Sequence, residues 1–139
     1  MERRLLQACV ALAALAAVGA GIAGVFWGAA GLGEQAPSGL DSQYRALSGA
    51  LVAIGVAYWT TVPDIERAGA RFGLLTVIVV AGGFARALGM LIAGPPGPAA
   101  AAALALELLA APGLYLWQAR IQRLAERAPV LTAVDAAEG

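Results

Sequence analysis

Two opposite charges interrupt apolar runs of this chain at matching depths. Arg86 lies within the run 72–93, and Glu107 lies within the next run, 98–119. Counted outward from the turn that joins the two runs, these charges are eight and nine residues in. A helical rise of about 1.5 Å per residue then places both roughly 12–14 Å deep in a bilayer. Because charges at such a depth normally face a bundle interior and find partners, we predict a contact between Arg86 and Glu107.

The Arg86–Glu107 contact has two interpretations, which the sequence leaves open. A structural ion pair would fix the register of the helical hairpin, although a buried pair is weak evidence of stability. A ligand or proton site would use the same two charges, since ionisable residues within a membrane often mark function. Pro112 adds polarity nearby, because it cannot donate a hydrogen bond to the Leu108 carbonyl and should kink the helix one turn beyond Glu107.

A second charged group lies at the start of the predicted span 41–62. Asp41 and Arg45 are four residues apart, so they share a helix face and can pair. Asp41 also suits the positive end of the helix dipole. Tyr44 adds a hydroxyl group beside them. Two interpretations stay open: an interfacial ion pair with a snorkelling arginine, or the outer wall of a binding site.

Together these residues form one candidate ligand-binding cluster in the outer half of the molecule. Its members are Asp41, Tyr44, Arg45, Arg86 and Glu107. The second and fourth predicted spans begin at the surface on which the third ends, so the three can converge there. A water-filled pocket or an anionic group from the outer leaflet would satisfy these side chains. We therefore expect a crevice that opens outward between these spans.

The composition is that of a membrane protein. Of the 139 residues, 60% are hydrophobic and 13% are charged, whereas soluble domains carry about 25% charged residues. Mean hydropathy is +0.77. The net charge of zero gives no indication of nucleic-acid binding. One cysteine, Cys9, and no histidine exclude an intramolecular disulfide and imidazole ligation of zinc or haem, so we expect no metal and no cofactor.

The apolar runs predict an all-α, four-transmembrane-helix bundle, since a spanning helix needs about 20 apolar residues. The expected spans are about 5–31, 41–62, 71–93 and 98–119. Connectors this short leave no room for another domain, so residues 1–127 form one bundle. An arginine-rich helix should extend the last span until Pro129 ends it. Residues 128–139 are expected to form a flexible cytoplasmic tail.

The arginines predict the orientation of the bundle. One side carries seven of the nine: Arg3, Arg4, Arg67, Arg71, Arg120, Arg123 and Arg127. The positive-inside rule then places both termini in the cytoplasm. Arg3 and Arg4 followed by an apolar stretch also resemble a signal peptide, but the run is longer than a usual signal core. We favour a retained helix.

The segment 19–24 matches the dinucleotide fingerprint G-x-G-x-x-G. That fingerprint requires a preceding strand and a helix N-terminus to bind the pyrophosphate. Here the glycines fall in the middle of a helix. Small residues recur on one face of it, at Ala13, Ala17, Gly21, Gly24, Gly28 and Gly31. Such faces allow helices to approach closely in lipid, so we interpret the motif as a packing surface.

Three stretches resemble a known family. They are DSQYRALSG at 41–49, GGFARAL at 82–88, and Glu107 followed by Pro112. They resemble a bacterial four-helix membrane family known as domain-of-unknown-function family 4345, and the similarity extends over about 3–123. The resemblance implies four helices and a bacterial membrane location. It implies no activity and assigns no site residue.

We expect a non-enzymatic, multi-pass inner-membrane protein that binds an anionic lipid headgroup, a small polar ligand or a partner protein at the cluster. The expected partners are membrane lipid, a second copy of the chain or another membrane protein. One alternative is a small transporter or proton-coupled carrier in which Glu107 titrates; four helices lack the paired repeats common in carriers, so it would act as an oligomer. Another is a lipid-modifying enzyme with Glu107 or Asp41 as general base, although no nucleophile constellation is present.

Overall fold

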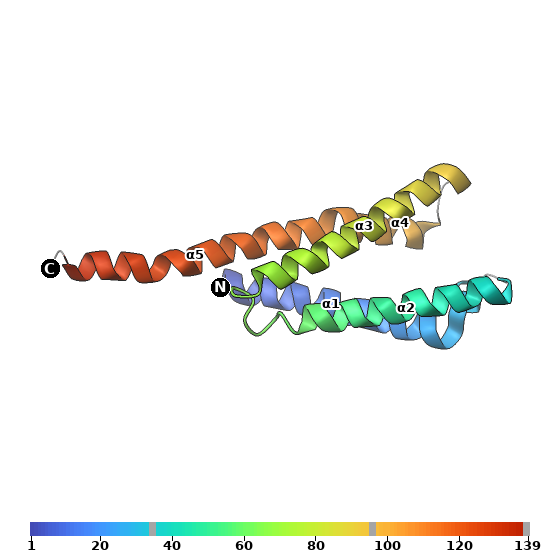
Figure 1. Cartoon of the computed structure of the whole chain (residues 1–139), viewed down its shortest axis with the longest axis horizontal. Helices are drawn as coiled ribbons and strands as arrows, with labels where there is room; N and C mark the ends of the chain where they lie inside the picture. The colour runs from blue at the N-terminus through green and yellow to red at the C-terminus, as the bar shows by residue number, and fades with distance from the viewer. Residues whose placement is uncertain (34–35, 95–96, 138–139) are drawn as a thin grey trace. The chain divides into compact units, whose positions relative to one another are not determined.

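The computed structural model describes residues 1–33, 36–94 and 97–137, without the side chains of residues 32 and 128–137. Within these ranges the chain is helical and contains no strand (Figure 1). The elements are α1 (Glu2–Trp27), the 3₁₀ segment η1 (Gly28–Leu32), α2 (Ser38–Trp59), α3 (Gly69–Ala93), α4 (Pro98–Ala105), the π-helical segment η2 (Leu106–Ala110) and α5 (Ala111–Ala137). Because α4, η2 and α5 follow one another without a break, the prediction of an all-α chain of four helices is confirmed.

The chain divides into two compact units. One consists of Gln7–Pro63 and contains most of α1, with η1 and α2; we call it the α1–α2 unit. The other consists of Met1–Leu6 and Asp64–Gly139, and contains α3, α4, η2 and α5; we call it the α3–α5 unit.

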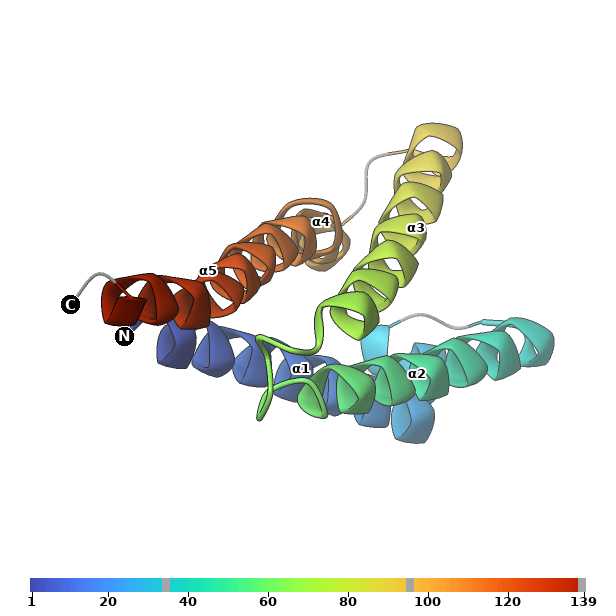
Figure 2. The same ribbon diagram turned by 60° about the vertical axis from the view of Figure 1, so that its left-hand side comes forward.

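Glycines allow α1 and α2 to pack closely side by side, as Figure 2 shows. A Cβ atom on Gly21 would lie 2.7 Å from the Ser48 carbonyl oxygen, and one on Gly24 would overlap the Ser48 side chain. On α2, a Cβ atom on Gly55 would lie 2.8 Å from the Val18 side chain. Close backbone contact of this kind is typical of helices that pack through small residues. The packing interpretation of the glycine motif is therefore confirmed at Gly21 and Gly24, whereas Gly19 contacts nothing within 4 Å.

The end of α2 is held by side chains of its own unit. The Thr61 hydroxyl donates to the Tyr58 carbonyl oxygen at 2.7 Å, which satisfies a carbonyl group in the last helical turn. Beyond that turn, Gln7 of α1 donates its Nε2 to the Val62 carbonyl oxygen at 2.7 Å. These two bonds fix where the chain leaves the hairpin of α1 and α2.

In the α3–α5 unit, one glycine sets the distance between α3 and η2. A Cβ atom on Gly83 would lie 2.7 Å from the Leu108 side chain and 3.0 Å from Cβ of Glu107. Gly82 and Gly89 take no part in this contact, because a Cβ atom at either would meet nothing within 4 Å. Both fall on the outward side of α3, since helical positions one or six residues from Gly83 do not share its face.

The helix that follows α4 widens around Glu107. The Ala111 amide donates to the Leu106 carbonyl oxygen, five residues earlier rather than four, and Leu106–Ala110 is π-helical. Pro112 explains the widening, because it has no N–H to continue the α-helical ladder toward Leu108. The departure from α-helical geometry thus includes Glu107 itself, whereas the sequence predicted a kink one turn beyond it.

At the arginine-rich end of the α3–α5 unit, polar contacts join three segments. Gln118 of α5 is completely buried and donates its Nε2 to the Ile65 carbonyl oxygen at 2.8 Å. Arg3 pairs with Glu66 at 2.8 Å. The pKa of Glu66 lies below its usual value, because the carboxylate accepts hydrogen bonds from the Glu66 backbone amide and from Arg3. Glu2 lies 3.4 Å from Arg120. The first turn of α1, the loop before α3 and the middle of α5 therefore lie together at the same end of the α3–α5 unit.

The last helix is longer than predicted. α5 continues to Ala137, so Pro129 does not end it. A proline inside a helix removes one backbone hydrogen bond and strains the preceding turn, but here the helix resumes beyond it. The flexibility of the segment 128–139 stays a prediction, and its last two residues lie outside the described part of the chain.

Among the described residues, three helices are long and apolar enough to cross a membrane: Glu2–Gly31, Gly69–Ala93 and Pro98–Arg127. They coincide with the first, third and fourth predicted spans. α2 does not reach the same hydropathy, because its first half carries Asp41, Arg45 and further polar residues up to Ser48. The second crossing is therefore still a prediction.

Candidate functional site: two satisfied ion pairs

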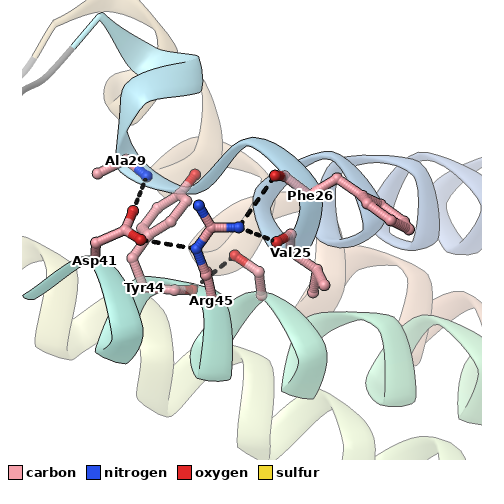
Figure 3. A network of polar contacts seen from close by, with 7 residues as sticks. Val25, Phe26, Ala29, Asp41, Tyr44 and Arg45 are labelled. Atoms are coloured by element: carbon pink, nitrogen blue, oxygen red, sulfur yellow. Dashed lines mark hydrogen bonds and ion pairs between the residues drawn. The ribbon is translucent and has the colours of Figure 1, made fainter. Parts of the chain in front are cut away.

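Asp41 and Arg45 form a hydrogen-bonded network with the end of α1 (Figure 3). Arg45 Nε donates to Asp41 Oδ2 at 2.7 Å, which confirms the predicted pair. Arg45 Nη1 donates to the carbonyl oxygens of Val25, at 2.6 Å, and Phe26, at 3.0 Å. Asp41 Oδ1 accepts the Ala29 backbone N–H at 2.8 Å.

This network caps α1. The last carbonyl groups of an α-helix lack intrahelical donors and carry the negative end of the helix dipole. Arg45 supplies both a positive charge and two hydrogen bonds at that end, while Asp41 satisfies an amide of η1 just beyond it. The arrangement depends on Gly28, whose φ of +62° turns the chain from α1 into η1. A Cβ atom there would overlap Asp41 Oδ1 and lie 2.6 Å from Arg45 Nη2.

Two hydrogen-bonding groups of the network remain unused. Among the described residues, Arg45 Nη2 and the Tyr44 hydroxyl have no hydrogen-bond partner. The Tyr44 ring packs over Gly24, where a Cβ atom would lie 3.3 Å from its Cε1. In Figure 3 the ring and the free guanidinium nitrogen both point away from α2 and toward the junction of α1 and η1. The Arg45 side chain is 41% exposed, and Tyr44 is half-buried.

Arg86 and Glu107 form the second pair, and the predicted contact is confirmed. Arg86 Nε donates to Glu107 Oε2 at 2.9 Å, and its Nη2 donates to Oε1 at 2.8 Å. Such two-pronged geometry is the strongest form of an arginine–carboxylate contact. It ties α3 to the π-helical segment beside Gly83, where the Leu108 side chain and Cβ of Glu107 lie against α3. Both carboxylate oxygens of Glu107 are engaged.

The five candidate residues thus occur as two groups, one in each unit. Asp41, Tyr44 and Arg45 belong to the α1–α2 unit, and Arg86 and Glu107 belong to the α3–α5 unit. Their convergence around one crevice remains a prediction. Within the α3–α5 unit the structure has an apolar groove of about 510 Å³ between α3 and α5, and neither Arg86 nor Glu107 lines it. Its lining residues are Thr76, Val77, Val80, Ala81, Phe84, Pro112, Tyr115 and Leu116.

The sequence identified Asp41 as a partner of Arg45 but missed the backbone partners of this pair. These are the Val25 and Phe26 carbonyl groups, which bind Arg45, and the Ala29 amide, which binds Asp41. Every residue carries such backbone groups, so the sequence does not single them out. The available signal was Gly28 immediately after Trp27, since glycine is favoured just past a helix end. In the part of the chain that the structure describes, no group of three or more His, Cys, Asp or Glu side chains could hold a metal ion.

The fold and its ion pairs define an all-helical protein in which three helices are long and apolar enough to cross a membrane. The chain belongs to the family of domains of unknown function DUF4345, whose model matches residues 5–118. This match confirms the resemblance seen at the charged segments. Neither the curated proteins nor the solved structures include a match to the chain.

Proposed function

We propose that the chain is a multi-pass protein of the bacterial inner membrane that crosses it four times, with both termini in the cytoplasm. If only the three most apolar helices crossed the membrane, α2 would stay on one side of it. The first turn of α1 would then lie on the opposite side of the membrane from the loop before α3 and from the α5 arginines. The ion pairs Arg3–Glu66 and Glu2–Arg120 argue against that arrangement, because they join these segments at one level. Four crossings also keep seven arginines on one side, in agreement with the positive-inside rule.

The network at the end of α1 explains how α2 can enter the membrane despite its charges. An unpaired arginine within a spanning helix costs about 2.5–3.5 kcal/mol on translocon scales. Arg45 is instead paired with Asp41 and bonded to two carbonyl groups that would otherwise lack donors. α1 and α2 therefore enter the membrane as a hairpin whose polar groups satisfy one another.

The function that this geometry supports best is the binding of a lipid headgroup from the outer leaflet at Tyr44 and Arg45. The unused Nη2 and hydroxyl groups are donors, and they lie about one helical turn below the predicted surface. Phospholipids present phosphate and ester oxygens at that depth, and these are acceptors. A small polar ligand or a partner protein would use the same donors. Native mass spectrometry of a Tyr44 variant distinguishes these two from a lipid.

The arrangement of Glu107 gives less support to the rival functions. A proton-coupled carrier that titrates Glu107 would have to break two hydrogen bonds from Arg86 in every cycle. A lipid-modifying enzyme that uses Glu107 as general base would have to do the same before the carboxylate could accept a proton from a substrate.

Replacing Tyr44 with Phe should weaken lipid retention without weakening the fold. The change removes one hydroxyl donor and keeps the ring on Gly24, so we expect lipid affinity to fall by about three- to tenfold, the value of one hydrogen bond. Native mass spectrometry of the detergent-solubilised full chain, titrated with phosphatidylglycerol or phosphatidylethanolamine, measures it. Tyr115→Phe, in the apolar groove of the other unit, is the matched control and should bind as the wild type does.

Other outcomes separate the alternatives. Equal retention by Tyr44→Phe, Tyr115→Phe and the wild type would rule out a headgroup at this site. A wild-type mass that carries a non-lipid adduct, lost in Tyr44→Phe, would identify a small polar ligand instead. Co-purification of a second polypeptide that dissociates only from Tyr44→Phe would identify a protein partner.

A further inference from the structure

One exposed face of α5 changes from apolar to basic along its length. Leu116 is 68% exposed, and the exposed arginines 120, 123 and 127 follow it at intervals of four, three and four residues. Residues at these intervals share a helix face. The opposite side of α5 is buried, with Gln118 completely inaccessible and Ile121 7% exposed. We call the three arginines the α5 arginine face.

The charges of the α5 arginine face are largely uncompensated. Arg120 lies 3.4 Å from Glu2, but both side chains are more than half exposed, and such pairs contribute little. Arg123 and Arg127 have no ion pair among the described residues. Glu126, the nearest acid along the helix, instead accepts a hydrogen bond from Gln122 at 3.0 Å.

Further positive charge lies beside this face. A Cβ atom on Gly69 would overlap Gln122, which places the first turn of α3 against the middle of α5. Arg67 and Arg71 flank that turn, and no side chain caps it, so the positive end of the α3 dipole adds to their charge. Among the side chains that the structure describes at this end of the α3–α5 unit, seven arginines are set against four carboxylates, those of Glu2, Asp64, Glu66 and Glu126. The field there favours anions.

The spacing along α5 gives the depth of each arginine. With Leu116 in the hydrocarbon layer, Arg120 lies about 6 Å further along the helix and Arg123 about 10 Å, at the level of lipid phosphates. Arg127 lies about 16 Å beyond Leu116, within the charged layer in front of the headgroups. Arginine binds phosphate with two parallel hydrogen bonds and extends its apolar stem along the membrane.

We propose that the α5 arginine face binds the phosphate groups of anionic phospholipids, of the phosphatidylglycerol and cardiolipin class, in the cytoplasmic leaflet. The inference rests on the proposed membrane insertion but not on the outer site at Tyr44. Clusters of arginine next to a membrane-spanning helix recruit anionic lipids in this way. The bound lipid would hold the exposed leucine–arginine boundary of α5 at a fixed depth.

The test compares lipid enrichment around variants of the full chain. The protein is reconstituted in nanodiscs of phosphatidylcholine and phosphatidylglycerol at four to one, extracted gently, and its retained lipids are counted by native mass spectrometry. We expect the triple variant Arg120→Gln, Arg123→Gln, Arg127→Gln to lower the enrichment of phosphatidylglycerol over phosphatidylcholine by about tenfold. The corresponding Lys triple variant, which keeps the charge, should retain most of the enrichment.

The control removes the same charge elsewhere. Arg4→Gln, Arg67→Gln, Arg71→Gln should reduce the enrichment less than the α5 variant, because these side chains add to the local field but lie off the α5 arginine face. An equal reduction in both Gln triple variants would mean that the arginines attract anionic lipid diffusely, and it would contradict a site on α5. Unchanged enrichment of phosphatidylglycerol in the α5 variant would contradict the site as well. Tyr44→Phe should keep the α5-dependent enrichment, so failure of the outer headgroup site and failure of this proposal give different results.

Discussion

Arg86→Met should destabilise the protein by about 3–5 kcal/mol, because it leaves Glu107 charged and unpaired at an apolar level of the proposed bilayer. Glu107→Gln should cost a similar amount, since it removes the charge that both donors of Arg86 bind. Reversible unfolding in mixed detergent micelles, followed by circular dichroism, measures the change. Arg120→Met is the matched control: its pair with Glu2 is longer and more exposed, so we expect a loss below about 1 kcal/mol.

The double variant distinguishes an interaction from two independent losses. Arg86→Met with Glu107→Gln leaves no unpaired charge, so the double change should recover part of the summed loss. Strictly additive losses would show that the two side chains do not stabilise each other. Losses no larger than that of Arg120→Met would show that the pair is solvated and does not fix the register of α3 against η2.

Gly28→Ala should have the second large effect, because it acts on the turn and on the ion pair at once. A residue with a Cβ atom at φ of +62° costs about 1–2 kcal/mol by itself. The added Cβ atom would also displace Asp41 Oδ1 and Arg45 Nη2, which leaves carbonyl groups of α1 without donors. With about 1 kcal/mol for each lost hydrogen bond, we expect a total loss of about 3 kcal/mol or more.

Gly33→Ala separates these two contributions. Gly33 also has a positive φ, of +79°, but a Cβ atom there would meet nothing within 4 Å. It should therefore cost only the 1–2 kcal/mol or so of backbone strain. Unfolding in the same micelles measures both variants, and indistinguishable losses for Gly28→Ala and Gly33→Ala would contradict the capping role of Asp41 and Arg45.

The sequence predicted those features that depend on spacing. Arg86 and Glu107 pair because they are eight and nine residues from the short connector between their helices, and Asp41 and Arg45 pair because they are four residues apart. Helical periodicity likewise identified Gly21 and Gly24 as packing positions. Each of these follows from counting residues along a helix, which requires no knowledge of the neighbouring helix.

Features that depend on the backbone or on a particular neighbour could not be predicted. The carbonyl groups of Val25 and Phe26 become ligands of Arg45 only because α1 ends there. Pro112 indicated an irregular helix, but not whether the chain would kink beyond Glu107 or widen around it into the π-helical segment Leu106–Ala110. Gly82 and Gly83 are adjacent in the sequence, and only the facing Leu108 side chain distinguishes them.

The number of membrane crossings can be measured directly, and it decides whether the α1–α2 hairpin enters the bilayer. Single cysteines at Ser38, Asp64 and Gly97, in a Cys9→Ala background, are tested in intact cells with a membrane-impermeant maleimide. We expect labelling at Ser38 and Gly97 from the periplasm, and labelling at Asp64 only after the inner membrane is opened. Periplasmic labelling at Asp64 together with protection at Gly97 would mean that α2 does not cross, and it would contradict the four-crossing topology in which Arg45 enters the membrane bonded to the end of α1.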